Sequence, residues 1–169
     1  FGLTAVSVDA LLADPRVEII VNLTIPRAHV EVGLRALAAG KHVYSEKPLG
    51  VTFAEGKKLA EAAAQKGLRI GAAPDTFLGG GHQKARELID SGEVGPVVGG
   101  TAFMGVPGHE RWHPDPAFYY DIGGGPVLDM GPYYITDLVN LLGPVKSVQA
   151  VSATPQKERP IYSEPKKGQ

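Results

Sequence analysis

The chain has 169 residues, a net charge of −1 and no cysteine, and it contains 22 glycines and 14 prolines. The near-neutral charge argues against a nucleic-acid-binding surface, and the lack of cysteine excludes disulfides and thiolate metal sites. No apolar run approaches the ~18 residues that a membrane-spanning helix needs, so we expect neither nucleic acid nor a membrane as a partner.

The first part of the chain alternates short apolar runs with amphipathic ones. We predict strands at residues 17–23, 42–44 and 68–73. We predict helices at residues 10–13, 27–39 and 52–66. Asp9 is the expected cap of the first helix, and Thr52 with Glu55 forms a capping box at the start of the third. The order predicts one parallel β-α-β-α-β sheet, half of a doubly wound nucleotide-binding domain. Residues 17–23 are apolar on both faces, as in a central strand.

The character of the sequence changes near residue 75. We predict helices at residues 82–91 and from Pro132 to 142, and strands at residues 97–104 and 145–152. The tail, residues 154–169, is charged and rich in proline, which is typical of loop or disorder. The fold class is therefore α/β, with the second half of a Rossmann-type parallel sheet followed by the start of an α+β domain. That second domain is expected to hold an open, largely antiparallel sheet, and the predicted domains are residues 1–75 and 76–169.

Glu46, Lys47 and Pro48 follow directly after the second predicted strand. In an open α/β sheet ligands bind at the carboxyl ends of the strands, and a residue before proline has an extended backbone. Two interpretations are open. The pair Glu46–Lys47 is either a solvated loop pair or a lysine held in a crevice as a proton donor or acceptor.

His109, Glu110 and His113 match the H-E-x-x-H pattern of zinc proteases. The pattern holds zinc only on a helix, where both histidines lie one turn apart on the same face. Glycines precede this stretch, and Pro114 and Pro116 follow it. We therefore expect a loop and no metal site, with a zinc hydrolase as a remote alternative.

Asp129 and Tyr133 follow a run of three glycines and lie at the start of the predicted helix that ends at 142. Helical spacing would put Asp129, Tyr133 and Asp137 on one face, although Pro132 could delay the helix start. A carboxylate and a phenol on one face are either a substrate-binding pair or a satisfied hydrogen-bond pair.

These two motifs, Glu46-Lys-Pro48 and Gly123-Gly-Gly followed by Asp129-x-Gly131, resemble the Gfo/Idh/MocA family of oxidoreductases (glucose-fructose oxidoreductase, inositol dehydrogenase, rhizopine catabolism). The resemblance covers residues 1–153. It implies a cytoplasmic NAD- or NADP-dependent oxidoreductase acting on a sugar, polyol or related hydroxy compound, with a C-terminal sheet that serves substrate binding and homo-oligomerisation.

The resemblance also implies roles for individual residues. Lys47 is matched to the family's catalytic acid or base, and Asp129 to its substrate-binding aspartate. The expected cofactor-side residues are Asn22, Thr24, His29, Glu46, Lys47 and Pro48. Tyr133 stands where the family often has histidine, and because a phenol is a poor base at neutral pH, we expect Tyr133 to hydrogen-bond the substrate.

Two other activities fall within the same resemblance, namely a redox-cofactor-dependent glycosidase and a non-catalytic dinucleotide sensor. Retention of Lys47 and Asp129 argues against a pure sensor, which needs no base. The family's G-x-G-x-x-G fingerprint would lie before Phe1, and more of the C-terminal sheet would follow Gln169. We therefore expect these residues to be the middle of a longer protein, and to bind NAD(P) weakly and be inactive by themselves.

Overall fold

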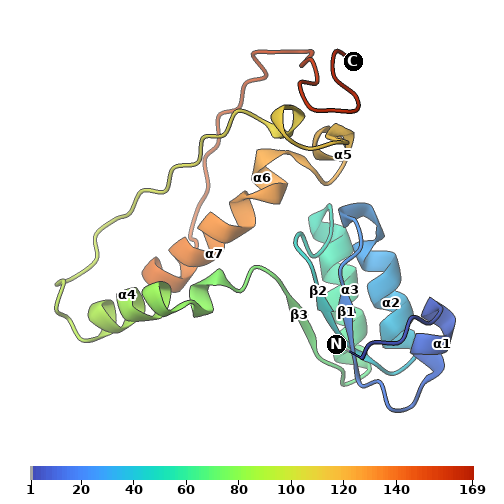
Figure 1. The fold of residues 1–169 in the computed structure, drawn as a ribbon. Coiled ribbons are helices and arrows are strands. Elements are labelled where there is room, and N and C mark those ends of the chain that lie inside the picture. Colours follow the sequence, from blue (N-terminus) through green and yellow to red (C-terminus); the bar gives the residue numbers. More distant parts are fainter. Residues whose placement is uncertain (1) are drawn as a thin grey trace. The chain divides into compact units, whose positions relative to one another are not determined.

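The computed structural model describes residues 2–169, which divide into two compact units, one ending at Pro74 and the other beginning at Asp75. Figure 1 shows the helices and strands of both units. The first unit contains α1 (Val8–Ala13), β1 (Ile19–Asn22), the 3-10 turn η1 (Pro26–Ala28), α2 (His29–Ala38), β2 (His42–Ser45), α3 (Phe53–Gln65) and β3 (Ile70–Ala72). The second contains η2 (Thr76–Leu78), α4 (Gly80–Asp90), η3 (His109–Arg111), α5 (Ala117–Tyr120), α6 (Gly125–Asp129) and α7 (Gly131–Leu142).

The three strands of the first unit form one parallel sheet in the order β1-β2-β3. Asn22 at the end of β1 is in register with Ser45 at the end of β2. The predicted β-α-β-α-β arrangement is confirmed. Because the strands are parallel, their carboxyl ends meet at one edge of the sheet, and the loops that leave β1 and β2 start side by side.

The core of the first unit lies between the sheet and the helices α2 and α3, which pack against each other. Its buried side chains are Ile20, Ala36, Leu37, Val43, Leu59 and Ala63. Gly33 lets the two helices approach closely, because a Cβ added there would lie 2.9 Å from Cδ1 of Leu59. The capping box of Thr52 and Glu55 is present as predicted and satisfies free backbone amides at the start of α3.

Three local expectations for the first unit need correction. The cap of α1 is Ser7, whose hydroxyl accepts from the amide of Ala10, and not Asp9. The predicted helix 27–39 starts as a 3-10 turn at Pro26 and becomes α-helical only at His29. In the described part of the chain, β1 is an edge strand of the sheet and not a central one.

Lys41 shows how a charged side chain can serve the fold rather than the site. It is only 7% exposed, and its ammonium group donates to the carbonyl of Asp14 at 2.8 Å. This bond ties the start of β2 to the end of α1, so that the buried ammonium has a hydrogen-bond partner.

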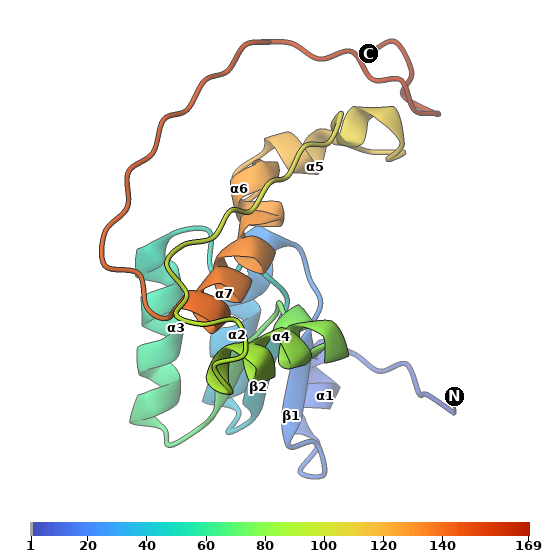
Figure 2. The same cartoon turned by 90° about the vertical axis from the view of Figure 1, so that its left-hand side faces the viewer.

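In the second unit α4, α7 and η2 contact one another, and α6 is followed directly by α7 (Figures 1 and 2). Nδ1 of His82 in α4 lies 2.7 Å from Oδ1 of Asp137 in α7. Arg86 of α4 donates to the carbonyls of Asn140 and Leu141 at 2.9 and 3.0 Å, which satisfies two of the open carbonyls at the end of α7.

The predicted strands at residues 97–104 and 145–152 are not formed in the second unit. Both runs are irregular and largely exposed, and the exposed fractions of Val98, Phe103 and Val151 are 98%, 86% and 102%. Figures 1 and 2 draw both runs as long loops without helix or strand. A strand exists only where a neighbouring backbone completes its hydrogen bonds, and residues 2–169 contain no such neighbour for either run. The expected antiparallel sheet is therefore absent from the described chain. None of its described helices is long and apolar enough to cross a membrane.

Candidate active site

The end of β1 is held by the side chain of Asn22, which is 2% exposed. Its amide donates to the carbonyl of His29 at 3.0 Å. Its Oδ1 accepts from the backbone amide of Thr24 at 3.3 Å and from the Thr24 hydroxyl at 2.7 Å. An asparagine that bonds the backbone two residues later forms an Asx-turn, so Asn22 shapes the loop while Thr24 remains at the surface.

The end of β2 continues the pairing with β1 for one more residue, because the amide of Glu46 donates to the carbonyl of Asn22 at 2.9 Å. Oε2 of Glu46 then accepts from the amide of Lys47 at 3.0 Å. Glu46 and Lys47 are half-buried, and Pro48 is buried. The Glu46 carboxylate therefore holds the backbone at Lys47, leaving the lysine at the carboxyl edge of the sheet.

His29 joins these two loops. Its Nδ1 lies 2.7 Å from the carbonyl oxygen of Pro48, and its Nε2 lies 2.8 Å from the carbonyl oxygen of Thr24. The structure thus brings all six predicted cofactor-side residues to one edge of the sheet. They differ in access, since Asn22, His29 and Pro48 are buried whereas Thr24, Glu46 and Lys47 reach the surface.

Asp129 and Tyr133 belong to the second unit. Asp129 is the last residue of α6, and Tyr133 lies in the first turn of α7, with Met130 as the junction between the two helices. No single helix carries both residues, so the common helix face considered for Asp129, Tyr133 and Asp137 is not formed. Asp137, the third member of the expected face, is paired with His82 and so joins α7 to α4.

The H-E-x-x-H stretch is not an α-helix. It forms the single 3-10 turn η3, after which Trp112 leaves helical geometry. Glu110 is 3% exposed and pairs with Arg159, whose Nε lies 2.8 Å from Oε1, and it also accepts from the Tyr120 hydroxyl. A zinc protease needs this glutamate as a free base, whereas here the carboxylate is already paired with the Arg159 guanidinium. Among the described residues no group of three or more His, Cys, Asp or Glu could hold a metal ion.

The surroundings of Glu110 form a cluster that sequence reasoning missed. The Glu110 carbonyl accepts from the amides of Tyr162 and Ser163 at 2.8 and 3.2 Å, so the tail is fastened to the η3 loop. Burial by itself would raise the pKa of Glu110, but the hydrogen bonds from Tyr120 and Arg159 lower it below its usual value. Burial and the bond to Glu110 raise the pKa of Tyr120 to about 12.

Tyr119, next to this cluster, connects it electrostatically to Asp129. Its ring stacks on His109 at a centroid distance of 3.8 Å, and it is 4% exposed. Burial, followed by the charges of Asp129 and Glu110, raises the pKa of the Tyr119 phenol. The phenol therefore stays protonated and is a donor at neutral pH. Nothing in the sequence pattern points to this arrangement, because Arg159 lies 49 residues from Glu110.

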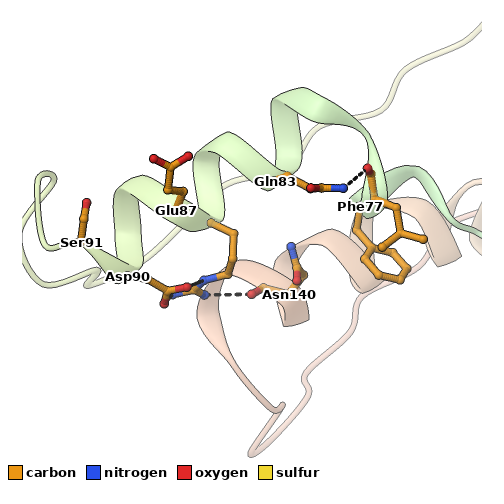
Figure 3. Close-up of a pocket in the computed structure, with 8 residues that line it drawn as sticks. Phe77, Gln83, Glu87, Asp90, Ser91 and Asn140 are labelled. Carbon is orange, nitrogen blue, oxygen red and sulfur yellow. Dashed lines mark hydrogen bonds and ion pairs between the residues drawn. The ribbon is translucent and has the colours of Figure 1, made fainter.

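A cavity of about 630 Å³ lies beside α4 and α7 in the second unit, lined by residues that include Phe77, Gln83, Arg86, Asp90 and Asn140. Figure 3 marks polar contacts at Gln83, Asp90 and Asn140 and draws none at Glu87 or Ser91. Gln83 donates to the carbonyl of Leu78, and Nε of Arg86 lies 3.0 Å from Asp90 Oδ2. The cavity contains none of the predicted site residues, and Arg86 joins α4 to α7 beside it through the carbonyls of Asn140 and Leu141.

Family models match both parts of the chain. The model described as "Oxidoreductase family, NAD-binding Rossmann fold" matches residues 3–73, and that of the GFO/IDH/MocA C-terminal domain matches residues 82–166. The chain belongs to the GFO/IDH/MocA family. The family inferred from the motifs at Lys47 and Asp129 is therefore confirmed, as are the Rossmann-type fold and the nicotinamide cofactor class.

Two curated relatives show the range of this family. The chain is 31% identical to a D-xylose dehydrogenase of Paenarthrobacter nicotinovorans, over 86% of this chain and 39% of the relative. It is also 31% identical to a 1,5-anhydro-D-fructose reductase of Ensifer adhaerens, over 76% of this chain and 39% of the relative.

Among solved structures, biliverdin reductase of Synechocystis sp. PCC 6803, in complex with biliverdin and NADP+, is similar with a TM-score of 0.63 and 32% identity. That match covers 83% of this chain and 43% of the other. The GFO/IDH/MocA chain described here spans about two fifths of the length of the curated relatives it matches.

Proposed function

We propose that this chain is part of an NAD- or NADP-dependent oxidoreductase that acts on a sugar, polyol or related hydroxy compound, with Lys47 as its acid or base. The observation that carries the proposal is the position of Lys47 at the carboxyl edge of a parallel sheet, among the ends of β1 and β2. Ligands of open α/β sheets bind outside this edge. The sugar class is supported by the names of the two curated relatives.

The residues at this edge fit the nicotinamide half of a dinucleotide. Thr24 and Lys47 provide polar groups at the surface, and the neighbouring side chain of Ile25, 49% exposed, provides apolar surface for a flat ring. Ribose hydroxyls and a nicotinamide ring need both kinds of contact. We therefore assign Thr24, Glu46 and Lys47 to cofactor contact, with Asn22, His29 and Pro48 as the support behind them.

In the proposed reaction the cofactor, when bound, supplies hydride transfer to or from the substrate carbon. The chain supplies the proton chemistry, since the Lys47 amine takes the proton of the substrate hydroxyl during oxidation and returns one during reduction. Asp129 and Tyr133, from the second unit, are assigned to the binding of substrate hydroxyls. A phenol at position 133 suits a hydrogen-bond role better than that of a base.

The test compares Lys47→Met with Tyr133→Phe in the full-length enzyme, with substrate and cofactor saturating. Lys47→Met keeps most of the side-chain volume and removes the proton acceptor, so kcat should fall by about 10²–10⁴-fold, or ~3–5 kcal/mol of barrier. Tyr133→Phe should mainly raise KM, since it removes one hydrogen bond worth about 0.5–1.5 kcal/mol.

Two outcomes would contradict the proposal. If Lys47→Met keeps most of its turnover, or if Tyr133→Phe loses kcat as heavily, the proton does not leave through Lys47. Absorbance of the reduced nicotinamide, followed during turnover, separates a dehydrogenase from redox-neutral glycoside hydrolysis, because only the dehydrogenase changes the cofactor's net redox state.

A further inference from the structure

His29 is the first residue of α2, and its side chain is completely buried, with an exposed fraction of 0%. Burial of a polar ring is costly unless its nitrogens have hydrogen-bond partners. The ring has two such partners, and both are backbone carbonyls at the edge that carries Lys47. One is Pro48, the residue after Lys47, and the other is Thr24, in the loop after β1.

Both partners of the ring are hydrogen-bond acceptors. A carbonyl oxygen only accepts hydrogen bonds, and a neutral imidazole has one N–H and one lone pair. With distances of 2.7 and 2.8 Å, a neutral ring would direct a lone pair at one of the two oxygens. The ring therefore donates to at least one of these carbonyls, while its other nitrogen lies within contact distance of the second.

The same loop is tied from the other side by Asn22. Its amide donates to the carbonyl of His29 itself at 3.0 Å, and its Oδ1 accepts from Thr24. The end of β1, the start of α2 and the backbone following Lys47 are thus one hydrogen-bonded unit. Beyond Ser45 no strand pairing holds the backbone around Lys47 except the bond from Glu46 to Asn22.

We propose that His29 is a positioning residue, whose buried ring fastens the backbone after Lys47 to the loop after β1. The inference rests on the proposed role of Lys47, but it concerns how that residue is held. It replaces the expectation that the His29 side chain contacts the cofactor, because the buried ring has both nitrogens at backbone oxygens. Displacement of a reacting group by about 1 Å can cost on the order of 10²-fold in rate, so the clamp affects turnover.

The first test reads the protons directly. In the full-length enzyme with ¹⁵N-labelled histidine, the ring nitrogen shifts distinguish protonated from bare nitrogens, and His29→Gln identifies the signals that belong to His29. We expect a ring N–H of His29 whose proton exchanges slowly with solvent, as the proton of a buried donor should. A ring proton that exchanges as fast as that of an exposed histidine would overturn the assignment whatever the enzyme's activity.

The second test uses His29→Phe, which keeps a ring and removes both ring nitrogens, and His42→Phe as the matched control. His42 lies in the same sheet, at the opposite end of β2, and its Nδ1 accepts from the amide of Arg69 at 2.9 Å. Both variants lose ring-to-backbone bonds, but only His29 contacts the loops beside Lys47. We expect kcat to fall about 10- to 100-fold in His29→Phe, with amide hydrogen exchange accelerated at residues 46–52, and neither change in His42→Phe.

The readouts separate the two proposals. If His29→Phe and His42→Phe have the same kcat and the same exchange at residues 46–52, the positioning role is wrong while the role of Lys47 can stand. If Lys47→Met is fully active, the proposed function fails, and the nitrogen shifts together with the exchange rates still decide whether His29 fastens the loop. Should His29→Phe not fold, His29→Leu, which also lacks the ring nitrogens, provides the same comparison.

Discussion

Gly33 provides a test of the packing between α2 and α3. A Cβ added at Gly33 would lie 2.9 and 3.1 Å from the two terminal carbons of Leu59, against about 3.5–4.0 Å for an ordinary carbon contact. Leu59 is 0% exposed and is surrounded by the core of the first unit, so it cannot move aside into solvent. We expect Gly33→Ala to incur an overpacking cost of about 1–3 kcal/mol.

The intrinsic preference of helices for alanine over glycine opposes this cost by about 1 kcal/mol. The net effect of Gly33→Ala is therefore a loss of about 0–2 kcal/mol in the free energy of unfolding. Gly56→Ala, in α3, is the matched control, since its Cβ would lie 3.8 Å from Leu49, an ordinary contact. There only the helix preference acts, and Gly56→Ala should stabilise the unit by up to ~1 kcal/mol.

The background variant Leu59→Ala isolates the contact itself. This truncation alone should cost about 2–5 kcal/mol, and in its presence Gly33→Ala has room and should become stabilising by up to ~1 kcal/mol. The assay is amide hydrogen exchange in α2 and α3, because the chain's one tryptophan, Trp112, lies in the second unit and does not report on the first. If Gly33→Ala stabilises as much as Gly56→Ala in the wild-type background, the two helices do not approach as described.

Two predictions concern the η3 loop. Hydrogen bonds from Tyr120 and Arg159 lower the pKa of the Glu110 carboxyl despite its burial. The ionised carboxylate therefore stabilises the fold fully above the pKa of glutamate in the unfolded chain, about 4.3. This stabilisation is lost as the pH falls through the lower pKa of the folded state. Glu110→Gln should lower the free energy of unfolding by about 1–3 kcal/mol at neutral pH. The difference from the wild type should become smaller below pH ~4, which is about the pKa of glutamate in the unfolded chain. Urea unfolding followed by Trp112 fluorescence measures this, and a pH-independent difference would contradict the assignment. Chelator should leave the same unfolding curve unchanged and the purified protein should contain no stoichiometric zinc. Bound zinc that disappears in His109→Ala would show a metal site that the geometry of η3 does not indicate.

The predicted strands at residues 97–104 and 145–152 show where local pattern is insufficient. Both runs have the β-branched and aromatic side chains of strands, and neither forms one. A helix satisfies its hydrogen bonds within a single segment, whereas a strand depends on a second backbone. The helices near residues 82–91 and 132–142 were accordingly predicted to within a few residues, while strand formation depended on neighbours that the pattern does not contain.

The sequence alone determined the parallel β-α-β-α-β order, the capping box at Thr52 and the placement of Lys47 after β2, because apolar periodicity and capping residues act over a few positions. The tertiary structure decided which polar side chains at that edge remain accessible. It buries Asn22 and His29 in the hydrogen bonds of the loops, and leaves Thr24 and Lys47 at the surface. It also pairs Glu110 with Arg159, so that this carboxylate is not available as the base of a zinc site. These outcomes depend on groups that come into contact only after folding. Because a buried polar group without a hydrogen-bond partner is costly, the fold that buries these side chains must also provide their partners.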